Sequence, residues 1–300
     1  MDIAVTGSHG LIGRALIASL ESDGHRVIPV VRGAATANAI VWDPESGTID
    51  AGGLEGLDAV VHLAGEGIAS KPWTASQRRR IHDSRAVGTK LLSDTLAGLH
   101  QPPATLISGS AIGFYGDRGS EVLTEHSTPG TGFLAEVCTA WEDATAAAEE
   151  AGIRTVHIRT GIVLDRRGGA LAAQLPIFRL GLGGRAGNGQ QWMSWITLHD
   201  EVAAIRHLID HPEVSGPVNL GSPNPVTNAD FTQALGATLH RPTFMVIPKV
   251  VGAVPFGVGD LVESLLFSSA RIQPEVLLGS GFSFSEPTIE SALATVLDRA

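Results

Sequence analysis

The sequence is poor in the features that mark several classes of protein. It holds one cysteine, Cys138, so no disulfide can form within the chain, and we expect a reducing, cytoplasmic compartment. It has no run of about 20 apolar residues, so we expect no membrane-spanning helix and no membrane partner. Its histidines fall into no metal-ligand spacing, so we expect no metal site.

Positive charge is also scarce. The chain has 21 Lys and Arg residues against 31 Asp and Glu residues, a net charge of −10, and its basic residues cluster only at Arg78, Arg79 and Arg80. A broad basic face that could neutralise phosphates is missing, so nucleic acid is not an expected partner. A hydrophobic content of 43% over 300 residues is typical of a globular protein with a sizeable core. The expected partner is a small molecule, and the oligomeric state is left open.

Strand-like apolar runs alternate with helical patterns along the first two thirds of the chain. The strand-like runs are 2–6, 26–31, 58–63, 105–108, 155–159 and 217–220. Apolar residues recur at helical spacing over 11–20, 78–99, 134–151 and 200–210. This alternation predicts an α/β fold built from βαβ units, with a Rossmann-type, doubly wound parallel sheet.

The composition changes near residue 170. Residues 181–189 are dense in glycine, and prolines recur between 223 and 255, as in loops and short helices. We therefore expect a first domain over 1–170 and a smaller, mixed C-terminal lobe over 171–300. A helical pattern and a strand-like run within 196–222 predict that this segment returns to the first domain.

A glycine-rich turn directly follows the first expected strand and directly precedes the first expected helix. In this turn Gly7 would allow the tight bend, Gly10 the approach of a pyrophosphate, and Gly13 the close packing of helix on sheet. N–H groups at the start of the helix would hold the diphosphate. A tight turn without a ligand is the alternative. The residues expected to bind a dinucleotide are Gly7, Ser8, His9, Gly10, Leu11, Ile12 and Gly13.

The end of the second strand predicts which dinucleotide is bound. NAD-binding folds place an acidic residue there, but this strand ends at Arg32, and no Asp or Glu occurs between Asp23 and Asp43. An arginine suits the 2′-phosphate of NADP, because its guanidinium can make a bidentate contact. We therefore expect NADP (NADPH) as the cofactor; a solvated arginine at a strand end is the alternative.

Seven further segments carry a resemblance to a known family. They are His62-Leu-Ala-Gly65, Arg85-Ala-Val-Gly-Thr-Lys-Leu-Leu92, Ile107-Ser-Gly-Ser-Ala-Ile-Gly-Phe-Tyr-Gly116, Phe133-Leu-Ala-Glu-Val-Cys-Thr-Ala-Trp-Glu142, Pro176-Ile-Phe-Arg-Leu-Gly-Leu-Gly-Gly184, Trp195-Ile-Thr-Leu-His-Asp200 and Pro274-Glu-Val-Leu-Leu-Gly-Ser-Gly-Phe-Ser-Phe284. With the glycine turn, they resemble the extended branch of the short-chain dehydrogenase/reductase superfamily, the group similar to nucleotide-sugar epimerases. The resemblance is closest to an NADP-binding, epimerase-like subfamily with a C-terminal domain of unknown function. It covers nearly the whole chain and is weaker after residue 225.

The resemblance implies further cofactor contacts. They fall on Leu63, Ala64, Gly65, Arg85, Ser108, Gly161 and Ile162. The first three would lie beside the adenosine and pyrophosphate, and the last two would cover the nicotinamide, near Ser108. Arg85 stands where relatives carry an asparagine and would reach a cofactor phosphate or ribose. An ordinary helix-surface arginine is the alternative, because charged residues are mostly exposed.

The same resemblance exposes a departure. Members of the superfamily use a Tyr-x-x-x-Lys pair, in which the lysine lowers the pKa of the tyrosine so that the phenol can move a proton during hydride transfer. We assign the two helical positions to Phe133 and Val137, and the single tyrosine, Tyr115, has no lysine four residues later. Ser110 still matches the position of the assisting hydroxyl.

Three residues are candidates for the missing acid/base: Ser110, Glu136 and Tyr115. Glu136 shares a helix face with Phe133 and would serve as a base if buried; a solvated glutamate is the alternative. Tyr115 would stack on the nicotinamide or the substrate, or pack as a core aromatic. We interpret Asp200 as a helix N-cap and Cys138 as a core residue.

The glycine-rich segment between the lobes is expected to contact the substrate, because such loops commonly shape pockets. A hinge or lid without direct contact is the alternative. Together these observations predict an NADP-binding, epimerase-like oxidoreductase acting on a small polar metabolite, for which a nucleotide sugar is one candidate. A non-catalytic NADP-sensing or scaffold protein is the alternative. The candidate substrate contacts are Arg179, Arg185, Gln190 and Trp192.

Overall fold

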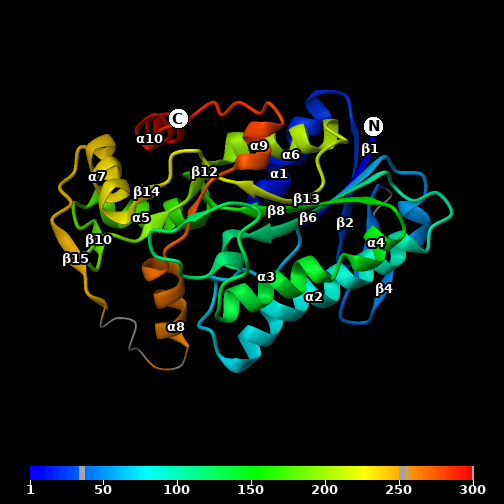
Figure 1. Ribbon diagram of the computed structural model, residues 1–300, viewed down its shortest axis with the longest axis horizontal. Coiled ribbons are helices and arrows are strands. Elements are labelled where there is room, and N and C mark those ends of the chain that lie inside the picture. Colours follow the sequence, from blue (N-terminus) through cyan, green and yellow to red (C-terminus); the bar gives the residue numbers. More distant parts are fainter. Residues whose placement is uncertain (34–37, 250–254, 256, 299–300) are drawn as a thin grey trace.

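The computed structural model describes residues 1–33, 38–249, 255 and 257–298, and its centre is one eight-stranded sheet (Figure 1). All strand pairs in this sheet are parallel except β3 with β4. In spatial order the strands are β13 (Gly216–Leu220), β8 (Arg154–Thr160), β6 (Thr105–Ala111), β5 (Ala59–His62), β1 (Asp2–Thr6), β2 (Arg26–Val31), β3 (Ile40–Asp43) and β4 (Thr48–Ile49). The order runs outward from β1 in both directions, which confirms the predicted Rossmann-type sheet.

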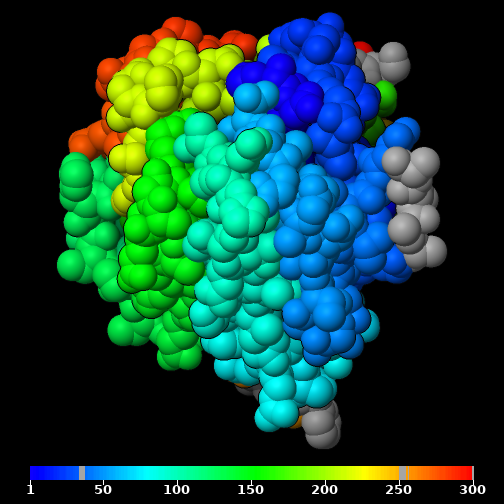
Figure 2. Space-filling model, turned by 90° about the vertical axis from the view of Figure 1, so that its right-hand side faces the viewer, coloured from blue at the N-terminus to red at the C-terminus, as the bar shows by residue number. Residues whose placement is uncertain are grey.

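The helices form one layer on each face of the sheet (Figure 1). Strands buried on both faces read as continuous apolar runs, and β5 is buried at each of its four positions. The first layer holds α1 (Leu11–Ser22), α6 (Leu198–Asp210) and α9 (Glu275–Gly279). The second layer holds α2 (Ala75–Ala97), α3 (Phe133–Asp143) and α4 (Ala146–Glu150). Figure 2 shows the right-hand end of the molecule in Figure 1, with the cyan segment that contains α2 at the surface between the blue N-terminal segment and the green region of α4.

Two differences from the predicted helices have a clear physical cause. The helix expected over 134–151 is divided into α3 and α4, because the Thr145 hydroxyl lies 2.8 Å from the carbonyl oxygen of Glu142 and competes with the helical pattern. The N-cap of α6 is Thr197, whose hydroxyl accepts the N–H of Asp200 at 3.0 Å. The N-cap interpretation of Asp200 is therefore wrong: its carboxylate accepts the N–H groups of Ser285 and Glu286 and so anchors the C-terminal segment.

The C-terminal part builds a second, smaller core beside the sheet. The chain returns to the main sheet through α6 and β13, and it crosses back to α2 at α8, where Asp260 binds Arg78 at 2.5 Å. The helices here are α5 (Gly169–Arg179), α7 (Asn228–Leu239), α8 (Val258–Val262) and α10 (Ile289–Asp298). Four strand pairs complete the fold: β9 (Ile162–Leu164) with β12 (Trp195–Thr197), β10 (Gly184–Ala186) with β15 (Met245–Ile247), β11 (Trp192–Met193) with β14 (Val226–Thr227), and β16 (Arg271–Ile272) with β7 (Val122–Leu123).

Among the described residues, three short helical turns also have defined limits. They are the 3-10 helices at Ala51–Leu54 and Ile112–Tyr115 and a π-helical turn at Glu263–Phe267. Within the described residues, none of the helices is both long and apolar enough to span a bilayer. The same part of the chain places no cluster of three or more His, Cys, Asp or Glu side chains where they could share a metal ion.

Candidate functional site

The predicted dinucleotide residues come together at the carboxyl ends of β1 and β5. β1 pairs with β2 on one side and with β5 on the other, so the chain leaves these two strands toward opposite ends of the sheet. Ligands of such sheets bind outside the carboxyl ends of the strands at this topological switch point. The glycine turn follows β1, and Leu63, Ala64 and Gly65 follow β5. We refer to the ends of β1, β5, β6 and β8 as the carboxyl edge.

Each of the three glycines of the turn is required, or leaves space, for a different structural reason. Gly7 has a φ of +67°, and a Cβ there would lie 2.7 Å from the carbonyl carbon of Leu63. A Cβ on Gly13 would overlap the carbonyl oxygen of Gly7, so α1 can lie this close to β1 only without a side chain there. A Cβ on Gly10 would meet only that same oxygen, at 3.1 Å, and nothing else within 4 Å. The space beside Gly10 is therefore open to a ligand.

The start of α1 leaves its N–H groups available. Gly10 is the N-cap and makes no side-chain cap, and the first turn of α1 has no acidic residue. Free N–H groups at the positive end of a helix bind anions, and a phosphate is the ligand this arrangement fits. Ser8 and His9 lie in the turn, with the Ser8 hydroxyl 3.3 Å from Nδ1 of His9, and Leu11 and Ile12 begin the helix.

A buried hydrogen-bond chain fixes the ends of β1 and β5. Thr6 Oγ1 accepts the N–H groups of Leu63 at 3.0 Å and Ala64 at 3.1 Å and lies 2.7 Å from Nδ1 of His62. Because that oxygen already accepts two N–H groups, its own proton goes to Nδ1, and Nε2–H of His62 donates to Thr89 on α2 at 2.9 Å. Burial lowers the pKa of His62 to about 4, so the ring is neutral at physiological pH. The sequence showed His62 only as the start of a motif, since its partners are remote.

Arg32 lies exposed directly after β2. Asp43, at the end of β3, is close enough for the charge of Arg32 to help lower its pKa, although hydrogen bonds from Ser46 and Glu45 are the larger causes. The spacing along the chain did not reveal this acidic neighbour, because it comes from the adjacent strand. The Asp43 carboxylate accepts the N–H groups of Glu45 and Ser46. None of the described residues forms a hydrogen bond or an ion pair with the Arg32 guanidinium, which can therefore meet solvent or a phosphate.

Arg85 reaches the carboxyl edge from α2. Its guanidinium carbon lies 3.1 Å from the position a Cβ on Gly65 would take, and one of its terminal nitrogens donates to the carbonyl oxygens of Glu66 and Ile81, at 3.0 and 3.1 Å. The ring of Trp141 on α3 lies 4.9 Å from the guanidinium carbon. The side chain is thus held over the segment that follows β5 and is not an ordinary surface arginine.

Ser110 leads into a buried ion pair. Its hydroxyl donates to Oε1 of Glu142 at 2.6 Å, and Glu142 pairs with Arg159 through two contacts of 2.8 Å. Arg159 also donates to the phenol oxygen of Tyr115 at 3.0 Å, and the phenol donates to Asn219 at 2.7 Å. The network joins β6, α3, β8 and β13 and includes two of the three acid/base candidates, Ser110 and Tyr115, of which Ser110 lies at the carboxyl edge.

Two predicted site residues lie inside the core. Tyr115 is 0% exposed with its hydroxyl engaged on both sides, so the structure corresponds to the packing alternative and leaves no ring face for a nicotinamide. Burial raises the pKa of Tyr115, which keeps the phenol neutral. Ser108 is also 0% exposed, beside His62 and His157 in the sheet, so the expected contact with the nicotinamide is not made by a side chain in this position.

Helix α3 turns a different pair of positions toward the carboxyl edge than we predicted. Phe133 and Val137 pack around Trp73 on the side of α2. Leu134 and Cys138 lie 3.2 and 3.5 Å from the position of a Cβ on Gly113, just beyond β6, although Leu134 also packs against the Trp73 cluster. Neighbouring helical residues point about 100° apart, so an error of one residue changes the face. Neither position carries an acid/base, because burial raises the pKa of Cys138 to about 12.

Glu136 points away from the carboxyl edge. It is exposed in a groove between α2 and α3, together with Arg79, His82 and Asp83. The burial that a catalytic role required is therefore missing, and the structure corresponds to the solvated alternative. The face of α3 on which Glu136 lies depends on where the helix begins. The structure shows that α3 begins at Phe133, after Gly132.

The candidate substrate residues lie on the glycine-rich segment and its flanks. Arg185 and Gln190 are exposed, and Trp192 is half-buried beneath the guanidinium of Arg271, which lies 4.2 Å from the ring centre. Sequence reasoning missed Arg271 because its partner is 79 positions away. Arg179 lies at the end of α5, where its carbonyl oxygen accepts Nε–H of Arg241.

The segment that follows β8 is held close to the C-terminal elements. Gly161 donates its N–H to Leu220 of β13, and a Cβ on Gly161 would lie 2.9 Å from the carbonyl oxygen of Ser194. Ile162 donates its N–H to that same oxygen at 2.8 Å. Both residues remain half-buried at the carboxyl edge, where they are available to a bound molecule.

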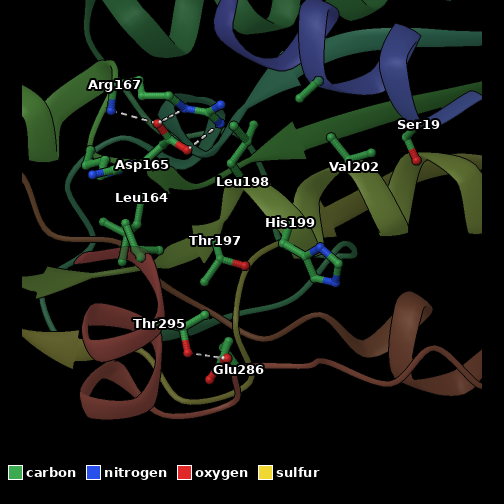
Figure 3. Close-up of a pocket in the computed structure, with 13 residues that line it drawn as sticks. Ser19, Leu164, Asp165, Arg167, Thr197, Leu198, His199, Val202, Glu286 and Thr295 are labelled. Atoms are coloured by element: carbon green, nitrogen blue, oxygen red, sulfur yellow. Dashed lines mark hydrogen bonds and ion pairs between the residues drawn. The ribbon is translucent and has the colours of Figure 1, made fainter. Parts of the chain in front are cut away.

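A cavity of about 360 Å³ opens elsewhere, between α1, the start of α6 and the C-terminal segment (Figure 3). Two of its charged groups have local partners: Arg167 binds Asp165, and Glu286 accepts the hydroxyl of Thr295 at 2.6 Å. Its residues on α1 are Ala15 and Ser19, which lie beyond the glycine turn. The cavity is therefore separate from the carboxyl edge.

Comparisons with known proteins agree with this arrangement. A model described as the NAD dependent epimerase/dehydratase family matches residues 3–221, and a domain of unknown function, DUF1731, matches residues 252–296. Epimerase family protein Mb2239 of Mycobacterium bovis is 44% identical over 298 residues, which cover 99% of this chain and 98% of that protein.

Two solved structures are similar over almost the whole chain. The crystal structure of human epimerase family protein SDR39U1 (isoform 2) with NADPH has 32% identity and a TM-score of 0.91 and covers 100% of both chains. The nucleoside-diphosphate sugar epimerase from Corynebacterium glutamicum has 39% identity and a TM-score of 0.81 and covers 99% of this chain. This chain spans only 58% of that longer protein.

Proposed function

Because this chain belongs to the NAD dependent epimerase/dehydratase family, we propose that it binds NADPH across the ends of β1 and β5. The single observation that carries the proposal is the glycine turn, where open space beside Gly10 meets the uncapped N–H groups of α1. The human relative was crystallised with NADPH, which supports the choice of cofactor. The exposed guanidinium of Arg32 supports the preference for a 2′-phosphate.

We further propose an epimerase-like oxidoreductase that acts on a small polar metabolite of the nucleotide-sugar type in the cytoplasm. When bound, the cofactor would supply the redox chemistry, with NADP⁺ taking a hydride from the carbon of a substrate alcohol and NADPH returning one to a carbonyl. In the oxidising direction Ser110 is the hydroxyl at the carboxyl edge, and its 2.6 Å bond to Glu142 lets it pass its proton to the carboxylate while Oγ accepts the proton of the substrate hydroxyl. Arg159 holds Glu142 in place through the paired contacts. Arg185, Gln190 and Trp192 would border the substrate.

One observation favours a second function, that of a non-catalytic NADPH sensor. The two positions of α3 that face the end of β6 are Leu134 and Cys138, so the helix offers no acid/base there. A positioned acid/base typically contributes about 10²–10⁴ in rate. Turnover distinguishes the two functions. An oxidoreductase oxidises NADPH or epimerises a nucleotide sugar, and Ser110→Ala abolishes this activity. A sensor shows no turnover and binds NADPH equally well with and without nucleotide sugars.

The cofactor site is tested by Gly10→Val, with Gly279→Val as the matched control. Both glycines have an ordinary φ, and Gly279 has no atom within 4 Å of a Cβ position. We expect Gly10→Val to fold normally and to weaken NADPH binding by about tenfold or more in tryptophan-quenching titrations, because its branched side chain fills the space of the pyrophosphate. Gly279→Val should bind as the wild type does. Unchanged NADPH affinity in folded Gly10→Val would contradict the assignment.

The cofactor preference is tested by Arg32→Ala, with Arg79→Ala as the control of equal charge change. Wild-type protein should bind NADPH at least about tenfold more tightly than NADH, and Arg32→Ala should lose this preference while keeping its affinity for NADH. Equal wild-type affinities for the two cofactors would show that Arg32 does not contact a 2′-phosphate.

A further inference from the structure

Arg85 carries a half-buried positive charge that the described residues do not balance. One terminal nitrogen donates to the carbonyl oxygens of Glu66 and Ile81, while Nε and the other terminal nitrogen make no hydrogen bond to residues 1–33, 38–249, 255 or 257–298. None of the carboxylates in these ranges forms an ion pair with it. A buried charge costs free energy unless it is paired, and arginine keeps its proton even where burial lowers its pKa. Within the described residues the free N–H groups of Arg85 therefore have no acceptor, and they are available to a bound anion.

The groups around this guanidinium cannot supply that partner. Glu66 presents its carbonyl oxygen, while its carboxylate accepts the side-chain amide of Gln77 at 3.1 Å. Cys138 stays a neutral thiol, because burial raises its pKa to about 12. Trp141 presents its ring. The direction left open is over Gly65, whose backbone is exposed at the carboxyl edge.

We propose that Arg85 is an oxyanion receptor, whose free N–H groups hold a carboxylate or phosphate oxygen over Gly65. Two parallel N–H groups of a guanidinium match the two oxygens of such a group. Gly65 follows the residues that we assign to the pyrophosphate, and Trp141 packs where a Cβ on Gly109 would lie, next to Ser110. The oxyanion therefore belongs either to the NADPH pyrophosphate or to the substrate. The inference rests on the proposed function for the position of the cofactor.

The same geometry gives a reason for the absence of a lysine on α3. Position 138 faces Arg85, and a lysine there would place a second positive charge against the guanidinium. The cation at this edge is supplied by α2 instead. We therefore expect that the positive charge can be moved from α2 to α3. The double variant Arg85→Asn/Cys138→Lys removes the charge from α2 and places one on α3.

The experiment compares Arg85→Asn, Arg85→Lys and the double variant Arg85→Asn/Cys138→Lys. Arg79→Asn is the matched control, because Arg79 is exposed on the same helix and loses the same charge. After melting curves establish folding, three ligands are titrated by tryptophan fluorescence: NADPH, adenosine 2′,5′-bisphosphate and malonate, the last on NADP⁺-saturated protein. Adenosine 2′,5′-bisphosphate keeps the 2′-phosphate but lacks the nicotinamide-side phosphate of the pyrophosphate. Wild-type binding of NADPH is measured first, so that failure of the cofactor site is seen separately.

Two results support the proposal and identify the source of the anion. If the anion is the pyrophosphate, Arg85→Asn weakens the affinity for NADPH by about tenfold or more and changes the affinity for adenosine 2′,5′-bisphosphate by less than about threefold. The double variant then regains part of the lost affinity for NADPH. If the anion belongs to the substrate, NADPH affinity holds and malonate binding is lost. Arg85→Lys keeps the positive charge but loses the two parallel N–H groups, so its affinity for the anion should lie between those of the wild type and Arg85→Asn. It replaces Arg85→Asn in the comparison if that variant fails to fold. Equal behaviour of the Arg85 variants and Arg79→Asn toward all three ligands overturns the proposal.

If wild-type protein fails to bind NADPH, the proposed function falls, but Arg85 is still judged. Malonate and inorganic pyrophosphate are then titrated on the cofactor-free protein. Loss of either in Arg85→Asn, with binding retained in Arg79→Asn, supports the oxyanion receptor. Equal binding in the two variants, or no binding to the wild type, overturns it.

Discussion

The two faces of the central sheet bury the same strands in different ways. Toward α1, α6 and α9, β6 and β8 present aliphatic side chains such as Ile107 and Ile158. Toward α2, α3 and α4 the same strands present Ser108, His157 and Arg159. Figure 1 shows that both faces are covered by helices, so the difference does not come from exposure to solvent.

The difference shows where this fold tolerates change and where it does not. Aliphatic contacts are non-directional and adapt to small changes in shape. A buried polar group requires one particular partner, and Arg159 finds Glu142 on α3 while His157 lies 2.8 Å from the hydroxyl of Thr145. The polar face therefore fixes the position of α3 at the carboxyl edge, where the proposed site lies.

The largest expected effect comes from breaking the ion pair. Glu142→Ala leaves the Arg159 guanidinium, only 5% exposed, without a carboxylate, and we expect a loss of about 3–5 kcal/mol in the free energy of unfolding. Ile158→Val, on the opposite face of the same strand, should cost only about 0.5–1.5 kcal/mol. Urea denaturation measures both.

A double variant checks the cause of that loss. Replacing both partners, by Glu142→Leu with Arg159→Met, removes the unpaired charge and should cost less than Glu142→Ala alone. The contrast between the two faces would be wrong if Glu142→Ala cost no more than Ile158→Val.

A buried carboxyl group on the aliphatic side, that of Glu201, gives a second test of the difference between the two faces. Glu201 on α6 is 0% exposed, and burial raises its pKa to about 8 despite a 2.8 Å hydrogen bond from Thr160. The folded protein thus keeps a proton that the unfolded chain releases near the ordinary pKa of 4.5, so stability falls as pH rises from about 4.5 to 8, by up to ~1.4 kcal/mol per pH unit.

Glu201→Gln should remove this slope, because the amide does not titrate. Denaturation at pH 5.5, 6.5 and 7.5 measures it, and the variant should gain on the wild type toward pH 7.5. Parallel curves for the two proteins would mean that Glu201 is ionised in the folded state.

His62 on the polar face should show the opposite sign. Its pKa of about 4 lies below the ordinary value of 6.5. Between these two pH values the unfolded chain therefore binds a proton at this histidine and the folded protein does not. Stability is therefore lost as pH falls from 6.5 toward 4, again by up to ~1.4 kcal/mol per unit but over a narrower range. His62→Gln should flatten the acid limb of the stability profile, whatever its effect at neutral pH. An unchanged acid limb would show that another group controls it.

Local patterns were enough to predict six of the eight strands of the main sheet and the glycine turn, but not β3 and β4. β1 and β2 have the predicted limits, and the glycine spacing predicted both the bend at Gly7 and the close packing at Gly13. Each of these features depends on residues a few positions apart. Backbone sterics and hydrophobic periodicity act at that range, so they can be read from one segment of sequence.

The remaining features depend on partners from distant segments. Arg159 and Glu142 are 17 positions apart on a strand and a helix, and no pattern links them. The phase of α3 decides whether Val137 or Cys138 faces the carboxyl edge, and it depends on where the helix begins. Asp200 looked like a cap but anchors the C-terminal segment. These roles are set by tertiary packing, which sequence spacing does not determine.

The smallest effect separates two serines on one strand. Ser110→Ala removes a hydrogen bond to a carboxylate and should cost about 1.5–3 kcal/mol, whereas the hydroxyl of Ser108 is buried without a partner among the described residues. Ser108→Ala should therefore change stability by less than about 1 kcal/mol, with a gain the expected direction, and leave the affinity for NADPH unchanged. A larger loss, or weaker NADPH binding, would mean that this hydroxyl meets a ligand after all, and that the polar face extends to the nicotinamide.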